Sequence, residues 1–299
     1  MTRITAHFGI NGPVPFLDVD VHQDNKLFLD PSAIRHAGGP MARRAHGLVL
    51  EFFREVMRCR TSPNRADREK GLALLQRLHE PNETRLGMSK AGSAGHAFGD
   101  ELGSILWDVL DQPVFTADPI ARRLEDLPLF VDRVGDDLVS DLTTRIVFEV
   151  LADFTAQQCA LHPALAASVV TRDIDLWDIG SNDWVTRPVQ LPWVAPHQLL
   201  LVPKEWVFWR MIMDPTAFYN HFGTGTVQME RTTTNLQGRK VAPSKESLKK
   251  EFPHVKELNI RQTVKYAHEE HRDLVAEYRD RVDAEFTYLV DDEIARRLA

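Results

Sequence analysis

The spacing of apolar residues predicts that most of this chain is helical. Apolar side chains recur every three or four positions along residues 40–60 and 66–79, which is the pattern of a helix with one buried face. The residues TSPN between these segments predict the break that separates the two helices. The same spacing predicts further helices and a helical tail: residues 95–110, 118–126, 136–160 and 244–286.

Two other segments have the apolar runs expected of strands. In residues 14–34 two short runs flank the turn-forming residues HQDN, which predicts a β-hairpin that ends at Asp30 and Pro31. Residues 198–207, QLLLVPKEWV, predict a buried strand that stops at Pro203, because proline cannot donate a ladder hydrogen bond.

Together these elements predict an α+β fold: a mixed sheet with a largely helical shell and a helical C-terminal region. No internal repeat and no low-complexity linker marks a clean boundary. We therefore expect a mixed core domain over residues 1–235, followed by a helical appendix over residues 236–299.

Composition narrows the class of protein. Of the 299 residues, 43% are hydrophobic and 26% are charged, as in an ordinary globular chain. The N-terminus lacks the pattern of a signal peptide, and no window approaches the roughly 18 apolar residues of a spanning helix, so we expect a cytoplasmic protein that does not enter membranes. Cys59 and Cys159 lie in predicted helices and are expected to be buried, reduced thiols.

An acid-rich stretch, GDDLVSDLTTR, contains the first candidate site. Asp137 and Asp141 are one helical turn apart, so they share a face on which they could jointly hold Mg²⁺. Thr143, Thr144 and Arg145 follow and would add hydroxyls and a cation. The alternative is that these acids only stabilise the positive end of the helix dipole.

A glycine series forms the second candidate site. The stretch SKAGSAGHAFGDELG leads into a predicted helix, and its backbone could form a nest that binds phosphate. The candidate binding residues are Ser89, Lys90, Gly92 and Gly95. The stretch matches no complete nucleotide-binding fingerprint, because the lysine comes before the glycines. The alternative is that glycines spaced by four, such as Gly99 and Gly103, let another helix approach closely.

A third pattern resembles the nucleases of the PD-(D/E)xK class, which use strand acids and a strand lysine around Mg²⁺. Here Asp175 precedes the predicted strand that carries Lys204. The position two before that lysine is Val202 rather than an acid, so the chain departs from the class at its diagnostic element. For a nuclease site we expect four aspartates as metal ligands: Asp30, Asp137, Asp141 and Asp175. The expected catalytic groups are Asp137, Asp141 and Lys204.

The C-terminal region is locally basic. Residues 239–265 hold eight lysine or arginine residues against three glutamates, whereas the whole chain has a net charge of -7. This segment is a candidate polyanion-binding surface, with Lys245, Lys249 and Lys250 as the expected nucleic-acid contacts. The alternatives are an ordinary solvated helix face and a contact for an acidic partner.

Four segments resemble an uncharacterised group of bacterial proteins associated with phage-defence gene neighbourhoods. They are NKLFLDPSAI, EPNETRLGMSKAGSAGHAFG, DRVGDDLVSDLTTRI and LLLVPKEWV. The resemblance implies a role with nucleic acid or nucleotides and assigns no catalytic residue. Two hypotheses follow: a Mg²⁺-dependent nuclease or phosphodiester hydrolase that acts as a defence effector, or a non-catalytic component that binds a partner such as a helicase or an ATPase.

Overall fold

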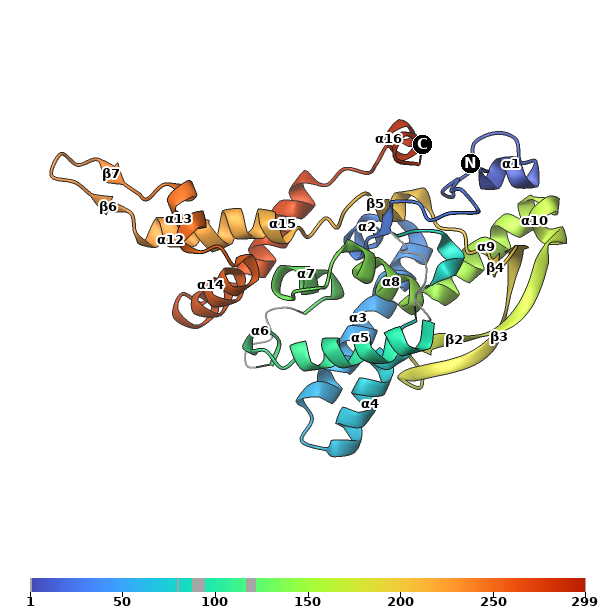
Figure 1. Cartoon of the computed structure of the whole chain (residues 1–299), viewed down its shortest axis with the longest axis horizontal. Helices are drawn as coiled ribbons and strands as arrows, with labels where there is room; N and C mark the ends of the chain where they lie inside the picture. The colour runs from blue at the N-terminus through green and yellow to red at the C-terminus, as the bar shows by residue number, and fades with distance from the viewer. Residues whose placement is uncertain (1, 80, 88–94, 117–121, 299) are drawn as a thin grey trace. The chain divides into compact units, whose positions relative to one another are not determined.

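The chain forms two compact units, each assembled from separate stretches of sequence. A computed structural model describes residues 2–79, 81–87, 95–116 and 122–298 (Figure 1). The first unit contains Met1–Asp108, Asp136–Met211 and Thr287–Ala299, and the second contains Val109–Gly135 and Ile212–Phe286. The boundary expected after residue 235 falls within the second unit.

The helices of the first unit make up most of its mass. They are α1 (Ile4–Phe8), α2 (Pro31–His36), α3 (Gly39–Thr61), α4 (Arg65–Gln76), η1 (Asn82–Thr84), α5 (Gly95–Val109, which ends at the first residue of the second unit), α8 (Asp136–Ile146), α9 (Phe148–Leu161), α10 (Pro163–Ala167), η3 (Lys204–Trp206) and α16 (Asp291–Arg297). Its strands are β1 (Phe28–Leu29), β2 (Val169–Asp178), β3 (Asp183–Val194), β4 (His197–Gln198) and β5 (Val207–Phe208).

The second unit is also mainly helical. Its helices are α6 (Pro113–Thr116), η2 (Leu124–Asp126), α7 (Leu127–Phe130), α11 (Pro215–Phe218), the π-helical turn η4 (Tyr219–Gly223), α12 (Thr224–Glu230), α13 (Lys245–Glu251), α14 (Val255–Glu269) and α15 (Leu274–Glu285). Its strands, β6 (Thr233–Thr234) and β7 (Lys240–Val241), form a short ribbon. Inside this unit, Arg279 forms a buried ion pair with Asp126, 2.6 Å between nitrogen and oxygen.

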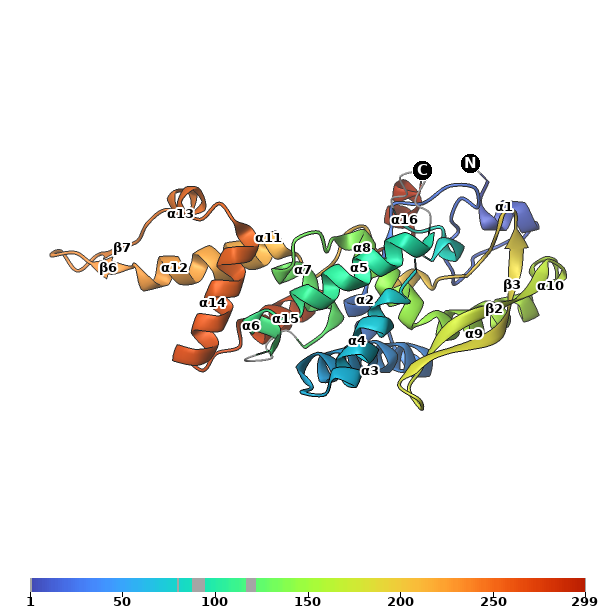
Figure 2. The same ribbon diagram turned by 60° about the horizontal axis from the view of Figure 1, so that its bottom comes forward.

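Helices α3 and α4 confirm the predicted helical pair and form a platform (Figure 2). The buried face of α3 includes Leu48, Phe52 and Val56, at the expected spacing of four. Asn64 is the N-cap of α4, and its side chain accepts a hydrogen bond from the Ala66 amide. The sequence therefore contained both the periodicity and the cap.

A long antiparallel hairpin, β2–β3, packs on this platform. Its register runs from Val169 opposite Pro192 to Asp178 opposite Asp183. Trp177 and Trp184 face each other as a cross-strand pair, and the Phe52 ring lies 5.0 and 5.7 Å from their ring centroids. Trp184 Nε1 also donates a hydrogen bond to the Leu74 carbonyl of α4. Aromatic packing and one buried hydrogen bond thus hold the hairpin to the helices.

The structure corrects both local strand predictions. Residues 14–34 do not form a hairpin: β1 pairs antiparallel with β5, so Phe28 lies opposite Phe208, far along the chain. Residues 199–203 are buried and extended but lie in no strand, and Lys204 begins a 3-10 turn. Buried apolar runs predict burial, but the pairing partner is non-local and leaves no local signal.

The predicted single helix over residues 136–160 is two helices, α8 and α9, separated at Val147. The hydroxyls of Thr143 and Thr144 donate hydrogen bonds to the carbonyls of Val139 and Ser140. Such bonds to the preceding turn bend helices, which accounts for a break three residues later.

Other predictions are confirmed at the level of class. The fold is α+β with a helical C-terminal region, and its strands form small antiparallel sheets. Both cysteines are free and helical, but only Cys59 is buried; Cys159 is half-buried. The helix over residues 95–110 is α5, whereas the one expected at 118–126 lies partly outside the described residues. In the described part of the chain, no helix has the length and apolarity that a bilayer crossing requires.

Candidate functional site

The first turns of α8 hold the predicted acid pair. Asp137 and Asp141 are half-buried and lie one turn apart, so they share one side of the helix. A side chain at Gly87 would place its Cβ 2.5 Å from Oδ1 of Asp137. Gly87 also has a φ of +112°, which disfavours other residues. This glycine, missed by the sequence reasoning, allows the carboxylate to lie against the backbone.

Asp30 follows β1, which packs against α8. The link is direct, because the Leu29 amide donates a hydrogen bond to Ser140 Oγ at 3.0 Å. The carboxylate of Asp30 is buried and caps α2, accepting hydrogen bonds from the Ser32 and Ala33 amides. Its first role is therefore structural, since a cap satisfies amides that have no partner within the helix.

Arg145 is a buried cation near the end of α8. Its Nη2 donates to the Asp175 carbonyl at 3.0 Å, and its guanidinium lies 5.1 Å from the Phe148 ring centroid. Its Nε has no hydrogen-bond partner. Burial lowers the pKa of this arginine, and the charges of Glu83 and Asp175 oppose that shift. Within the described residues no carboxylate forms an ion pair with this buried cation.

The two remaining members of the predicted nuclease site are engaged elsewhere. Asp175 Oδ1 accepts a hydrogen bond from the Thr186 hydroxyl across the β2–β3 hairpin. Lys204 Nζ forms an ion pair with Asp291 Oδ1 at 2.8 Å. Because the segment before Lys204 is not a strand, the strand acid and strand lysine of the PD-(D/E)xK pattern are not assembled.

The described residues contain no group of three or more histidine, cysteine or acidic side chains arranged to hold a metal ion. The expected ligands Asp30, Asp137, Asp141 and Asp175 are therefore not gathered into such a group. Metal binding by the α8 pair alone stays a prediction.

Family comparison gives the chain its place among known sequences. A family model described as a domain of unknown function, DUF8370, matches residues 11–214. The chain belongs to the DUF8370 family. No curated protein and no solved structure matched it. The DUF8370 match includes α8, Gly87 and Arg145, and it ends before α12 and the β6–β7 ribbon.

The glycine series lies in the DUF8370 region, and much of it cannot be placed. Ser89, Lys90 and Gly92 lie outside the described residues, and Gly95 begins α5. At Gly103 a Cβ would lie 2.7 Å from the backbone nitrogen of Gln76. The alternative interpretation of the series, close helix approach, is confirmed at that position, where α5 meets the end of α4.

Outside the DUF8370 match, the three lysines expected to bind nucleic acid lie together on α13. Lys245 Nζ donates to the Asn220 carbonyl at 3.0 Å, and Lys250 pairs with Glu246 one turn away on an exposed surface. Lys249 is exposed. The three lysines are thus exposed on α13, although Lys245 is bonded to η4 and Lys250 to the preceding turn of its own helix.

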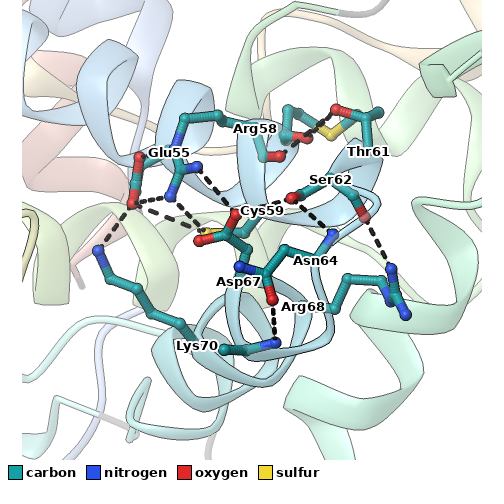
Figure 3. A network of polar contacts seen from close by, with 11 residues as sticks. Glu55, Arg58, Cys59, Thr61, Ser62, Asn64, Asp67, Arg68 and Lys70 are labelled. Atoms are coloured by element: carbon teal, nitrogen blue, oxygen red, sulfur yellow. Dashed lines mark hydrogen bonds and ion pairs between the residues drawn. The ribbon is translucent and has the colours of Figure 1, made fainter.

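A polar network joins α3 to α4 within the DUF8370 region (Figure 3). The Glu55 carboxylate is nearly buried and accepts hydrogen bonds from Arg58 and Lys70 at 2.7 to 2.9 Å. The bond from Arg58, followed by that from Lys70, lowers the pKa of Glu55 to about 2 despite its burial. Burial raises the pKa of the neighbouring Cys59 thiol, so that thiol stays protonated and unreactive. This network stabilises the helical platform and is not a candidate catalytic site.

Proposed function

We propose that the protein is a metal-dependent nuclease or related phosphodiester hydrolase that acts as an effector in bacterial phage defence. The observation that carries this proposal is the α8 arrangement: Asp137 and Asp141 lie on one side of the helix, and one turn further lies the buried cation Arg145, which forms no ion pair within the described residues. The resemblance of four sequence segments to proteins of phage-defence neighbourhoods supports the cellular role.

The donor set suits Mg²⁺ better than a metal that needs a complete protein cage. Mg²⁺ is commonly held by one or two carboxylates, with water and substrate phosphate oxygens in the remaining positions. Asp137 and Asp141 would hold the ion, which when bound lowers the pKa of a coordinated water and neutralises phosphate charge. Arg145 would add positive charge toward an approaching phosphodiester. This narrower site leaves out Asp30, which caps α2, Asp175, which is bonded to Thr186 across the β2–β3 hairpin, and Lys204, which is paired with Asp291.

The test is the melting temperature of wild type and Asp141→Asn, each with and without Mg²⁺. If the pair binds the ion, wild type is stabilised by about 2.7 kcal/mol at a hundredfold excess over Kd, and Asp141→Asn loses that response together with nuclease activity. Without Mg²⁺ the variant melts at the same temperature or higher, since repulsion between neighbouring carboxylates is relieved. Asp280→Asn, at an exposed helical carboxylate in the second unit, is the matched control and keeps the full response.

A second function is favoured by the absence of a three-ligand metal group among the described residues. In this alternative the protein is a non-catalytic component that binds a partner, such as a helicase or ATPase encoded beside it. Equal Mg²⁺ responses in wild type and Asp141→Asn would favour this alternative. A stable stoichiometric complex with the purified neighbour on gel filtration would then support it.

A further inference from the structure

The β6–β7 ribbon is a hairpin without a core. Thr233 pairs with Val241 and Thr234 with Lys240. Every residue from 233 to 242 is exposed, so neither face of the ribbon is covered. Both views show this ribbon extending beyond α12 and α13 (Figures 1 and 2). An isolated two-stranded hairpin is at best marginally stable in water, so burial does not explain its presence.

The tip of the ribbon is nevertheless ordered by its own hydrogen bonds. The Asn235 side chain accepts bonds from the amides of Gln237 and Arg239, and the Asn235 amide donates to the Arg239 carbonyl. Gly238 supplies the positive φ that the turn requires. This preformed turn presents Leu236 to solvent as a fully exposed side chain.

The base of the ribbon is anchored to α12. The Gln228 side chain donates to the Pro243 carbonyl at 2.8 Å, and the Thr232 hydroxyl donates to the Gln228 carbonyl. Two bonds at Gln228, one from its side chain and one to its carbonyl, therefore tie the returning and outgoing ends of the ribbon to the same helix turn. The ribbon is held at its base and free along its length, which is the construction of an arm; we call residues 232–243 the ribbon arm.

The charge around the arm is of one sign. Residues 231–245 contain four lysine or arginine residues and no acid, in a chain of net charge -7. Arg231, at the base, is paired with Glu251. In contrast, Arg239 and Lys240 on the arm form no ion pair within the described residues. Unpaired cations beside an exposed leucine match a ligand that offers both phosphates and apolar edges.

We propose that the ribbon arm enters the major groove of duplex DNA. Arg239 and Lys240 contact the phosphates, and Leu236 contacts base edges such as thymine methyl groups. The major groove of B-form DNA admits a two-stranded ribbon, and apolar side chains read thymine there. The inference names duplex DNA as the substrate class, and in that respect it rests on the proposed function.

Two other occupants fit the arm less well. Double-stranded RNA has a deep, narrow major groove that side chains cannot read, so the apolar tip would find no contact there. An acidic protein would pair with the two cations but lacks the regular groove that admits a two-stranded ribbon. Duplex RNA and poly-glutamate, which stands for an acidic protein, are therefore compared with DNA in the test.

The test is fluorescence anisotropy with a labelled A·T-rich DNA duplex, measured over a range of salt concentrations in EDTA so that no hydrolysis occurs. Removing two phosphate contacts in Arg239→Ala/Lys240→Ala should reduce the salt slope of log affinity by about 1.8. Leu236→Ala should weaken binding by about tenfold with the slope unchanged, since it removes an apolar contact rather than a charge.

The matched control is Arg54→Ala/Arg65→Ala, which removes two exposed cations of the first unit and should leave the slope unchanged. The inference would be overturned if both double variants lost the same salt slope, or if wild type did not bind DNA. Binding of poly-glutamate or duplex RNA as tight as binding of duplex DNA would also overturn it. Because EDTA removes Mg²⁺, this measurement does not depend on metal held by the α8 acids, and the acid-to-amide control Asp280→Asn should bind DNA normally. Loss of DNA binding in the arm variants would therefore support the arm even if the Mg²⁺ experiment removed the proposed hydrolase activity.

Discussion

Two antiparallel hairpins of this protein, β2–β3 and the ribbon arm, have opposite environments. In the β2–β3 hairpin, Trp177 and Trp184 are buried against the α3–α4 platform, and Arg187 is paired with Glu149 and Asp178. In the ribbon arm no residue from 233 to 242 is buried, and its cations have no acidic partner within the described residues. The first hairpin is held by the helices on which it packs, whereas the ribbon arm is held by hydrogen bonds at its base and within its own turn.

This difference separates residues that maintain the fold from residues that are available for binding. A buried aromatic pair contributes to the free energy of folding because its apolar surface leaves water. An exposed leucine such as Leu236 contributes little to folding, so its replacement should leave stability nearly unchanged, and any effect should appear in binding. Four substitutions test this division.

The largest effect is expected from Trp184→Ala. The change removes a nearly buried ring, its contact with Phe52 and its hydrogen bond to the Leu74 carbonyl. We expect the free energy of unfolding to fall by about 3 to 5 kcal/mol, as measured by urea denaturation. Trp193→Ala, at a half-buried position on the same hairpin, is the control and should cost clearly less. Equal losses would mean that the platform does not hold the hairpin.

The next largest loss of stability is expected from Glu55→Gln, which tests the polar network of the α3–α4 platform. The pKa of Glu55 is lowered from 4.5 to about 2, chiefly by the Arg58 hydrogen bond. Its ionised form therefore stabilises the fold fully above pH 4.5, and this contribution is lost as the pH falls from 4.5 toward 2. At neutral pH the variant should lose about 2 to 3 kcal/mol.

The measurement is urea denaturation of wild type and Glu55→Gln at neutral pH and at several pH values below 4.5. The difference between the two proteins should narrow as the pH falls. Glu69→Gln, at the exposed partner of Arg65, is the control and should show a small difference at every pH. A difference for Glu55→Gln that is independent of pH would contradict the assigned cause.

A smaller effect is expected from Arg187→Ala on the buried hairpin. The side chain is half-exposed, and its pairs with Glu149 and Asp178 are open to solvent and salt. We expect a cost of about 0.2 to 1 kcal/mol that decreases when salt is added. A larger cost that salt leaves unchanged would show that the ion pairs, and not the tryptophans, hold the hairpin.

The smallest effect is expected from Leu236→Ala in the ribbon arm. Because the side chain is fully exposed, the melting temperature should hardly move, which corresponds to less than about 0.5 kcal/mol. Differential scanning fluorimetry of the purified protein is sufficient. A clear destabilisation would show that Leu236 is packed in solution, and the contrast between the two ribbons would disappear.

The sequence by itself determined several of the helices, but not the strands. Apolar spacing located α3, α4 and α5, and the turn chemistry of TSPN located the break between the first two. It also identified Asp137 and Asp141 as neighbours on one helix face, because that relation depends only on helical geometry. The α+β class followed from the same patterns.

Tertiary structure alone decided which side chains meet across the chain. It pairs β1 with β5, sets Gly87 against Asp137, buries Arg145 and ties Lys204 to Asp291. It also leaves residues 233–242 of the ribbon arm exposed to solvent. The physical reason is that an apolar run or a charge in sequence specifies only a preference for burial or solvent, whereas the partner that satisfies it comes from a distant segment whose approach depends on the packing of the whole unit.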